Sequence, residues 1–141
     1  AAMILGAKPQ QIAAAAHIGE TGVDEQTGIL LRYENGALAN LSRAVRASTP
    51  HEALIVGTEG TISIDPSWWK GESATLKAGD REERVELPLE GNGYNYEAQE
   101  VARCLREGLR ESPVMPLDET VALMQILDEA RAQIDLKYPM E

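Results

Sequence analysis

Two adjacent tryptophans, Trp68 and Trp69, are the residues of this chain whose type and spacing point most directly to a binding site. They follow Asp65 at the end of a short apolar run. Neighbouring residues of a strand point to opposite faces, so at most one of the two rings can enter a core beneath the sheet. The other ring is then expected on the open side of the sheet, where it lines a substrate pocket or a subunit contact. Aromatic residues also dominate ordinary cores, so a purely structural role stays open for the pair.

Gly91-Asn92-Gly93 has the spacing that begins a dinucleotide-binding loop, in which glycines let a pyrophosphate approach the N-terminus of a helix. The third position of that motif requires Gly or Ala, but Tyr96 stands there, and no second strand–helix–strand unit follows. We therefore expect these glycines to form a flexible link between a strand and a helix.

The other residues capable of chemistry give no catalytic set. Lys8-Pro9 follows a helix end rather than a strand of a nucleotide-binding fold, which favours a structural role. His17 and His51 have no cysteine nearby and no carboxylate set at metal-ligand spacing, so each is expected on a strand surface. Cys104 lies at the margin of an apolar helical stripe and is expected to be a buried, inert thiol. We thus expect no catalytic residue and no metal site in this chain.

The composition limits the partners and the setting of the protein. Thirteen Lys and Arg against 23 Asp and Glu give a formal net charge of −10, which disfavours a nucleic-acid partner, and no polybasic patch suggests an anionic membrane. No apolar run is long enough for a membrane span, and no signal peptide is visible. With one cysteine among 141 residues, the chain is expected to be a single cytoplasmic domain without disulfides.

Short apolar runs separated by turn signals indicate a meander of about six strands before Pro88. Asn35-Gly36 predicts a hairpin with a type I′ turn, in which both central residues need positive φ. The continuously apolar run 53–56 is expected to be buried on both faces. Because short hairpin links dominate, the sheet is expected to be largely antiparallel. The strands are expected within residues 11–18, 28–33, 37–47, 53–56, 61–65, 73–78 and 83–87.

Beyond Pro88 the apolar period becomes helical. The first helix is expected within residues 95–112, with Asn95 as its N-cap and a buried stripe of Ala98, Val101, Ala102, Leu105 and Leu109. Its acidic and basic residues alternate as a solvated face with pairs at i, i+3 or i+4; they are Glu97, Glu100, Arg103, Arg106, Glu107, Arg110 and Glu111. The second helix is expected over about 117–134, burying Val121, Met124, Leu127 and Ile134, and Pro139 closes the chain.

The predicted fold is therefore α+β, an open sheet covered on one face by the two C-terminal helices. Its other face has apolar strand residues such as Ala13, Ala15 and Leu31, and an exposed patch of that kind usually marks an interface. We expect a second subunit to cover this face. Residues 1–5 are helix formers, Gly6 sits where a helix often ends, and Pro9 follows, so the chain is expected to start with the last turn of a helix.

Four segments in order carry a family resemblance: ILGAKPQQIAA, ETGVDEQTGILLRYENGALANL, IVGTEGTISIDPSWW and GYNYEAQEVARCLREGLRESPVMPLDETVALMQILDEAR. Together the sequence resembles the C-terminal domain of the glucose-fructose oxidoreductase / inositol dehydrogenase / MocA (Gfo/Idh/MocA) family, and most closely its dihydrodiol and xylose dehydrogenase branch. The likeness covers essentially the whole chain.

The resemblance implies that residues 1–141 are a substrate-binding and dimerisation domain, which an N-terminal Rossmann domain carrying NAD or NADP and the catalytic lysine would precede. By this likeness the chain alone binds no cofactor and is inactive, and its partners are a homodimeric copy and a small-molecule substrate, a sugar or an aromatic diol. Trp68 matches a pocket aromatic of the branch, Trp69 is its neighbour, and Tyr94 and Tyr96 lie in the loop that resembles the pocket rim. The alternative is a free-standing ligand-binding or oligomerisation module without catalysis.

Overall fold

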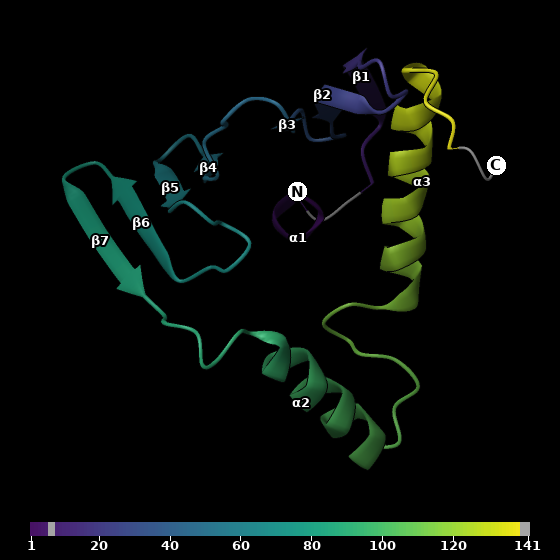
Figure 1. Cartoon of the computed structure of the whole chain (residues 1–141). Coiled ribbons are helices and arrows are strands. Elements are labelled where there is room, and N and C mark those ends of the chain that lie inside the picture. Colours follow the sequence, from purple (N-terminus) through teal and green to yellow (C-terminus); the bar gives the residue numbers. More distant parts are fainter. Residues whose placement is uncertain (6–7, 139–141) are drawn as a thin grey trace. The chain divides into compact units, whose positions relative to one another are not determined.

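The computed structural model describes residues 1–5 and 8–138. Its residues cluster into two compact units, one formed by Ala1–Thr49 with Pro113–Glu141 and one by Pro50–Ser112. Each unit contains its own antiparallel sheet (Figure 1). The α+β class and the antiparallel pairing are confirmed. The described residues contain seven strands, one overlapping each of the seven expected ranges, although the expected total was about six. The strands form a three-stranded and a four-stranded sheet rather than one, because β4 pairs with β5 and the Pro50-containing link after β3 is not a strand.

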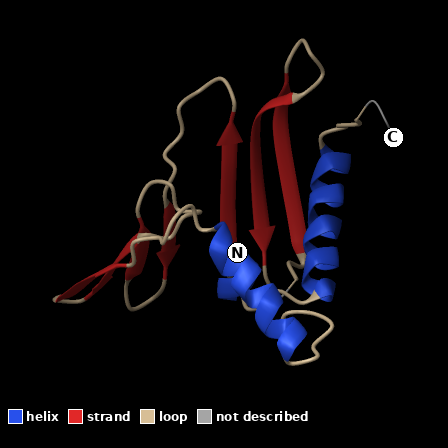
Figure 2. Cartoon of the chain, turned by 60° about the horizontal axis from the view of Figure 1, so that its bottom comes forward, coloured by secondary structure: helices blue, strands red, loops and turns tan. Residues whose placement is uncertain are grey.

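The first unit is a three-stranded sheet with a long helix beside it (Figure 2). The strand order is β1-β2-β3, and α3 packs against β1. The short α1 agrees with the helical end expected at the start of the sequence. Gly6, expected to end that helix, and Pro139 lie outside the described residues. The elements of this unit are α1 (Ala2–Leu5), β1 (Gln11–Ile18), β2 (Asp24–Arg32), β3 (Leu38–Ala44) and α3 (Leu117–Gln133).

The hairpin between β2 and β3 is confirmed, but its turn type was predicted wrongly. The Gly36 N–H donates to the Tyr33 carbonyl at 3.0 Å, and the Tyr33 N–H donates to the Ala37 carbonyl at 2.9 Å. Gly36 has a φ of 83°, whereas Asn35 is not among the residues with positive φ. The connection is therefore a turn of type I kind followed by one left-handed glycine, the three-residue alternative to the type I′ hairpin.

The register of the sheet separates its two faces and corrects one expectation. Ala13 pairs with Leu30, whereas Leu31 pairs with Ile12, so Leu31 points away from the face of Ala13 and Ala15. Leu31 is only 3% exposed. It belongs to the core of this unit, whose buried residues are Thr27, Leu31, Tyr33, Ala130 and Leu136.

Helix α3 has the predicted bounds, but it buries a different stripe. Val121, Met124 and Leu127 are exposed, whereas Ala130 is buried. The helix has apolar residues on every side, so the period of its apolar residues alone did not determine which side meets the sheet. The less exposed residues fall on a neighbouring stripe that includes Ala122, Leu123, Ile126 and Ala130.

The second unit is a four-stranded sheet in the order β4-β5-β6-β7 with one helix. Strand β4 is an edge strand with Leu54 and Val56 exposed, so the expectation that residues 53–56 are buried on both faces was wrong. The sequence run is apolar throughout, but its exposure alternates, so one of its two faces is exposed. The elements are β4 (Ala53–Val56), β5 (Thr61–Ile64), β6 (Ser73–Ala78), β7 (Arg81–Glu86) and α2 (Tyr94–Arg106).

Helix α2 differs from its prediction at both ends and in its buried side. Gly93, not Asn95, is the N-cap residue, and the helix ends at Arg106. Val101 and Leu105 of the predicted stripe are exposed, whereas Cys104 is the buried residue of this helix. Within the first unit, helix α3 makes the helix–strand contact, with β1.

Both long helices end in a Schellman motif, which satisfies carbonyls that have no partner within the helix. After α2 the Leu109 N–H donates to the Cys104 carbonyl at 2.9 Å, and Gly108 takes the left-handed position with φ 68°. After α3 the Leu136 N–H donates to the Arg131 carbonyl at 3.2 Å, and Asp135 takes the same position with φ 56°. The left-handed position is thus occupied by a glycine at the end of α2 and by an aspartate at the end of α3.

Exchanging these two residue types is expected to change stability in opposite directions. Asp135→Gly relieves a left-handed non-glycine residue and is expected to raise the free energy of unfolding by about 0.5–1 kcal/mol. Gly108→Ala introduces the same strain and is expected to lower it by about 1 kcal/mol, since no atom lies within 4 Å of the added Cβ to compensate or clash. Urea denaturation of both variants measures the two changes. Shifts of the same sign would contradict this account.

Candidate functional site

The tryptophan pair lies in the loop between β5 and β6. Trp68 and Trp69 occupy a turn rather than a strand: the Lys70 N–H donates to the Ser67 carbonyl at 2.8 Å and the Gly71 N–H to the Trp68 carbonyl at 3.2 Å. The expected alternation between two sheet faces is therefore wrong, because these residues are not part of a strand and their rings contact each other. Trp68 is 51% exposed and Trp69 is 57% exposed. Both rings lie at the surface of the described structure.

His51 joins the two tryptophans into one aromatic cluster. The Trp68 N–H donates to the His51 carbonyl at 3.0 Å. The His51 and Trp69 ring centroids are 5.1 Å apart with their planes at 61°, and the two indoles meet edge to face at 6.2 Å and 81°. These are favoured geometries for aromatic pairs. His51 precedes β4 in an irregular segment, so its expected place on a strand was wrong. We call His51, Trp68 and Trp69 the tryptophan cluster.

Asp65 anchors the loop that carries the tryptophan cluster. Its Oδ2 accepts hydrogen bonds from the Ser73 hydroxyl on β6 at 2.7 Å and from the Arg84 guanidinium on β7 at 2.8 Å. These two partners, the Ser73 hydroxyl first, hold the pKa of Asp65 below its usual range. The loop is therefore tied to two neighbouring strands at its base. Sequence reasoning missed this role of Asp65, since the partners are 8 and 19 residues away.

Tyr94 and Tyr96 start helix α2. The Tyr96 hydroxyl oxygen accepts the Glu90 N–H at 3.0 Å, which leaves its own O–H as a donor, and Tyr94 is 69% exposed. Among the described residues the recorded ring contacts bring the two tryptophans together with His51 and link neither of them to Tyr94 or Tyr96. The two tryptophans thus form a cluster with His51, whereas Tyr94 and Tyr96 are a separate feature of the same unit.

The glycine link before α2 does not fit a pyrophosphate-binding loop. The Asn92 side chain accepts the Tyr94 N–H at 3.2 Å, and the Gly93 carbonyl accepts the Tyr96 N–H at 3.2 Å. These first-turn amides are the groups that a dinucleotide would need. The interpretation of Gly91-Asn92-Gly93 as a strand-to-helix connection agrees with this geometry.

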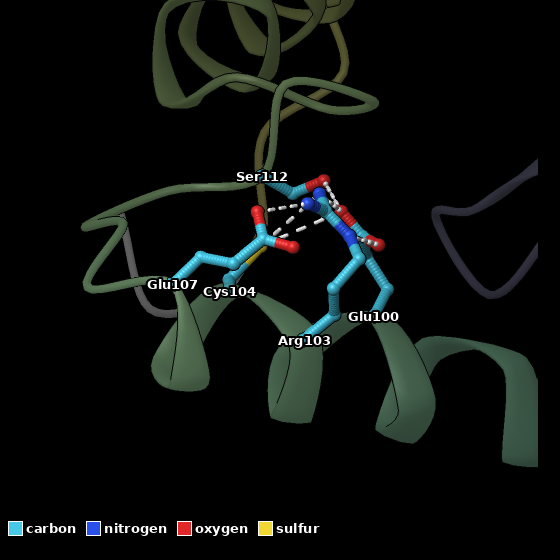
Figure 3. A network of polar contacts seen from close by, with 5 residues as sticks. All are labelled: Glu100, Arg103, Cys104, Glu107 and Ser112. Atoms are coloured by element: carbon cyan, nitrogen blue, oxygen red, sulfur yellow. Dashed lines mark hydrogen bonds and ion pairs between the residues drawn. The ribbon is translucent and has the colours of Figure 1, made fainter.

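A polar network of five residues connects α2 with the segment that follows it (Figure 3). Arg103 binds Glu100 through two nitrogens, at 2.8 and 2.7 Å, and Glu107 at 2.6 Å. Ser112 donates its hydroxyl to Glu100 at 2.5 Å, which ties the segment after the helix back to it. Cys104 is 6% exposed, and burial raises the pKa of its thiol. The i, i+3 and i+4 pairs of Arg103 with Glu100 and Glu107 were predicted for this charged face, whereas the link to Ser112 was not. The thiol is buried as expected.

The stabilising effect of this network depends on pH through the Glu100 carboxylate. Its Arg103 and Ser112 partners lower the pKa of Glu100 from 4.5 to about 2. A carboxylate whose pKa is lower in the folded state contributes stability above its unfolded pKa and loses it as pH falls through the folded value. The free energy of unfolding of the unaltered chain is therefore expected to fall more steeply from about pH 4.5 to pH 2 than that of Glu100→Gln. Urea titrations at several pH values measure this, with Glu97→Gln as control. Equal slopes for Glu100→Gln and the unaltered chain would contradict it.

A groove of about 280 Å³ lies in the other unit, between α3 and the strands β2 and β3. An ion pair of Arg43 with Asp24 at 2.7 Å lies on its sheet side, and one of Arg131 with Asp128 at 2.9 Å lies on its helix side. The Thr27 hydroxyl and then Arg43 lower the pKa of Asp24. No predicted site residue lines this groove, and no sequence signal joined Asp24 to Arg43.

The structure supports neither a metal site nor a membrane span within the part of the chain that it describes. Residues 1–5 and 8–138 contain no group of three or more His, Cys, Asp or Glu placed to hold a metal ion. No helix in this part is long and apolar enough to cross a membrane.

Comparisons with known proteins agree with the fold. Residues 1–63 match the family model described as the GFO/IDH/MocA C-terminal domain. The chain is 38% identical over 148 residues to trans-1,2-dihydrobenzene-1,2-diol dehydrogenase of Mus musculus, covering 99% of this chain and 44% of that protein. It is 39% identical over 142 residues to the Danio rerio enzyme of the same name, covering 96% of this chain and 42% of that protein. The chain thus spans less than half the length of these relatives.

Solved structures share the fold at low sequence identity. The aldose-aldose oxidoreductase of Caulobacter crescentus, complexed with glycerol, superposes with a TM-score of 0.79 at 17% identity, over 95% of this chain and 41% of that one. The biliverdin reductase of Synechocystis, in complex with biliverdin and NADP+, gives a TM-score of 0.72 at 16% identity, over 95% and 42%.

The chain thus shares the fold of the matching part of these solved structures, and its sequence is similar to part of several dehydrogenases. Residues 1–63 are similar to the Gfo/Idh/MocA C-terminal domain, and nearly the whole chain is similar to the dihydrodiol dehydrogenases.

Proposed function

We propose that the chain is the substrate-binding and dimerisation domain of an NAD- or NADP-dependent dehydrogenase that acts on diols or sugars. The observation that carries this proposal is the similarity over nearly the whole chain to several dihydrodiol dehydrogenases. The chain makes up less than half of these relatives, so the cofactor and the catalytic groups are assigned to sequence that a full-length protein adds. The chain alone is then inactive.

The tryptophan cluster is the proposed substrate contact. Its indoles present a large, exposed apolar surface on a loop fixed by Asp65, and such surface binds the face of an aromatic ring or the C–H side of a sugar. Tyr94 and Tyr96 are proposed for the rim of the same pocket, where the Tyr96 O–H supplies a donor to a substrate hydroxyl. The cofactor supplies hydride transfer when bound, and the residues of this chain bind and orient the substrate.

The open face of the β1–β3 sheet is the proposed dimer interface. The register aligns Ala13 with Leu30 and Asn40, and it aligns Ala15 with Gly28 and Ser42. These mostly small side chains form a flat surface on which a second sheet can pack closely. We propose that two copies of the chain meet through this face as a homodimer.

Turnover by the full-length protein tests the proposed function. The expected result is NAD- or NADP-dependent oxidation of a trans-dihydrodiol or of an aldose, followed by the absorbance of the reduced cofactor. Full-length protein that binds neither cofactor, or that binds one and oxidises no member of either substrate class, would contradict it.

A further inference from the structure

One edge of the three-stranded sheet is unpaired by any strand among the described residues. Strand β1 pairs with β2 and is the first strand in the order β1-β2-β3. Backbone groups of alternate residues point to opposite sides of a strand, so Ile12, Ala14 and Ala16 direct their N–H and C=O groups to the same edge. An exposed row of such groups is a template for pairing with another chain.

The side chain of Gln133 occupies this edge. Its Nε2 donates a hydrogen bond to the Ile12 carbonyl at 2.9 Å, and its Oε1 accepts one from the Ala14 N–H at 2.8 Å. In a parallel ladder, a neighbouring residue makes the same two bonds, one to the residue before its partner and one to the residue after it. The primary amide of Gln133 therefore stands in for the peptide group of a strand that would lie opposite Ala13.

The fold fixes Gln133 in this position. It is the last residue of α3, and the Schellman motif that follows fixes the end of the helix through the Leu136 N–H and the Arg131 carbonyl at 3.2 Å. Helix α3 packs along β1, and earlier in the helix Gln125 accepts a hydrogen bond from Lys8 at 3.5 Å.

We propose that the Gln133 side chain blocks the addition of another strand at the β1 edge. The strand that it excludes is β1 of a second copy of the chain. An edge pairs with its own copy in antiparallel orientation about a two-fold axis, here centred on Ala14 with Ile12 opposite Ala16. The run of four alanines on β1 puts no bulky side chain in the way of such an approach. A register shift between His17 and Ile18 ends the regular part of the β1 edge at the C-terminal end of the strand. This proposal is independent of the proposed enzymatic function and of the dimer through the open sheet face.

Amide hydrogen exchange of the unaltered chain gives the first test, and it depends on no variant. The Ala14 N–H bonds to Gln133, so it is expected to exchange about tenfold more slowly than the Ala16 N–H, which faces the same edge. Equal exchange of the two amides would overturn the proposal.

Gln133→Ala gives the second test. The Ala14 amide is expected to exchange about tenfold faster, and sedimentation is expected to show association that grows with concentration beyond that of the unaltered chain. Gln125→Ala, the same change on the same helix, is expected to do neither. If Gln133→Ala does not fold, Gln133→Glu keeps the size and the acceptor but places an oxygen against the Ile12 carbonyl, and it is expected to associate. A folded Gln133 variant that sediments like the unaltered chain would overturn the proposal.

Discussion

Trp68→Ala in the full-length protein with the proposed dehydrogenase activity is expected to lower kcat/KM by about 10- to 100-fold while the Kd of the cofactor stays unchanged. The Trp68 ring is half exposed and contacts the Trp69 ring edge to face, and the backbone N–H of Trp68 donates to the His51 carbonyl. Removing the ring deletes apolar contact with the substrate and leaves the loop backbone in place. Steady-state kinetics with the preferred substrate, together with fluorescence titration of the reduced cofactor, measure the two quantities.

Further variants separate substrate contact from general damage. Trp68→Phe keeps an aromatic face and is expected to retain most of the activity. Tyr138→Ala removes an aromatic residue of comparable exposure from the other unit and is expected to leave kcat/KM unchanged. If Trp68→Ala and Tyr138→Ala gave equal kcat/KM values, Trp68 would have a structural role only.

Ala15→Lys is expected to convert the proposed homodimer into a monomer. Ala15 lies opposite Gly28 in the middle of the open sheet face, where a lysine would place a charge in a packed and desolvated contact. Because the same substitution on each copy brings two like charges to a symmetric interface, the effect is doubled. Light scattering over a range of concentrations measures the mass.

The matched control for this change is Ala47→Lys, an equal change at an exposed position after β3. It is expected to leave the dimer intact. A monomeric unaltered chain, or a dimeric Ala15→Lys variant that retains its fold by circular dichroism, would exclude this face as the interface.

The parts of the fold that could be predicted are those set by local pattern. Alternation gave β1 with its observed bounds, and a short run between turn signals gave β6. The helical period with an acidic first turn gave α3. The Gly36 hairpin was also found, although its turn is of another type. Each of these signals lies within a few residues of sequence and needs no knowledge of distant contacts.

The parts that could not be predicted depend on which side of an element meets its partner. Helix α3 has apolar residues on every side, interspersed with polar ones, so choosing Val121, Met124 and Leu127 as its buried stripe was an arbitrary choice among similar faces. Leu31 was assigned to the open sheet face, yet a one-residue step moves a side chain to the other face. The division of the strands into two sheets depends on pairings that no local pattern encodes.

The candidate site shows the same limit. Trp68 and Trp69 were identified from their residue type, but His51, 18 positions before Trp69, joins them only in three dimensions. Asp65 stands close to them in sequence, yet its anchoring role depends on Arg84 of β7. An aromatic pair can therefore be recognised from the sequence, whereas the residues that hold it cannot.

The measurement that tests the central claim most directly is a structure of the full-length protein with its cofactor and a bound substrate analogue. The account predicts that carbon atoms of the analogue lie in contact with the Trp68 ring, within about 4.5 Å. An analogue bound at the cofactor with no atom near Trp68, Trp69, Tyr94 or Tyr96 would contradict the assignment of substrate binding to these residues.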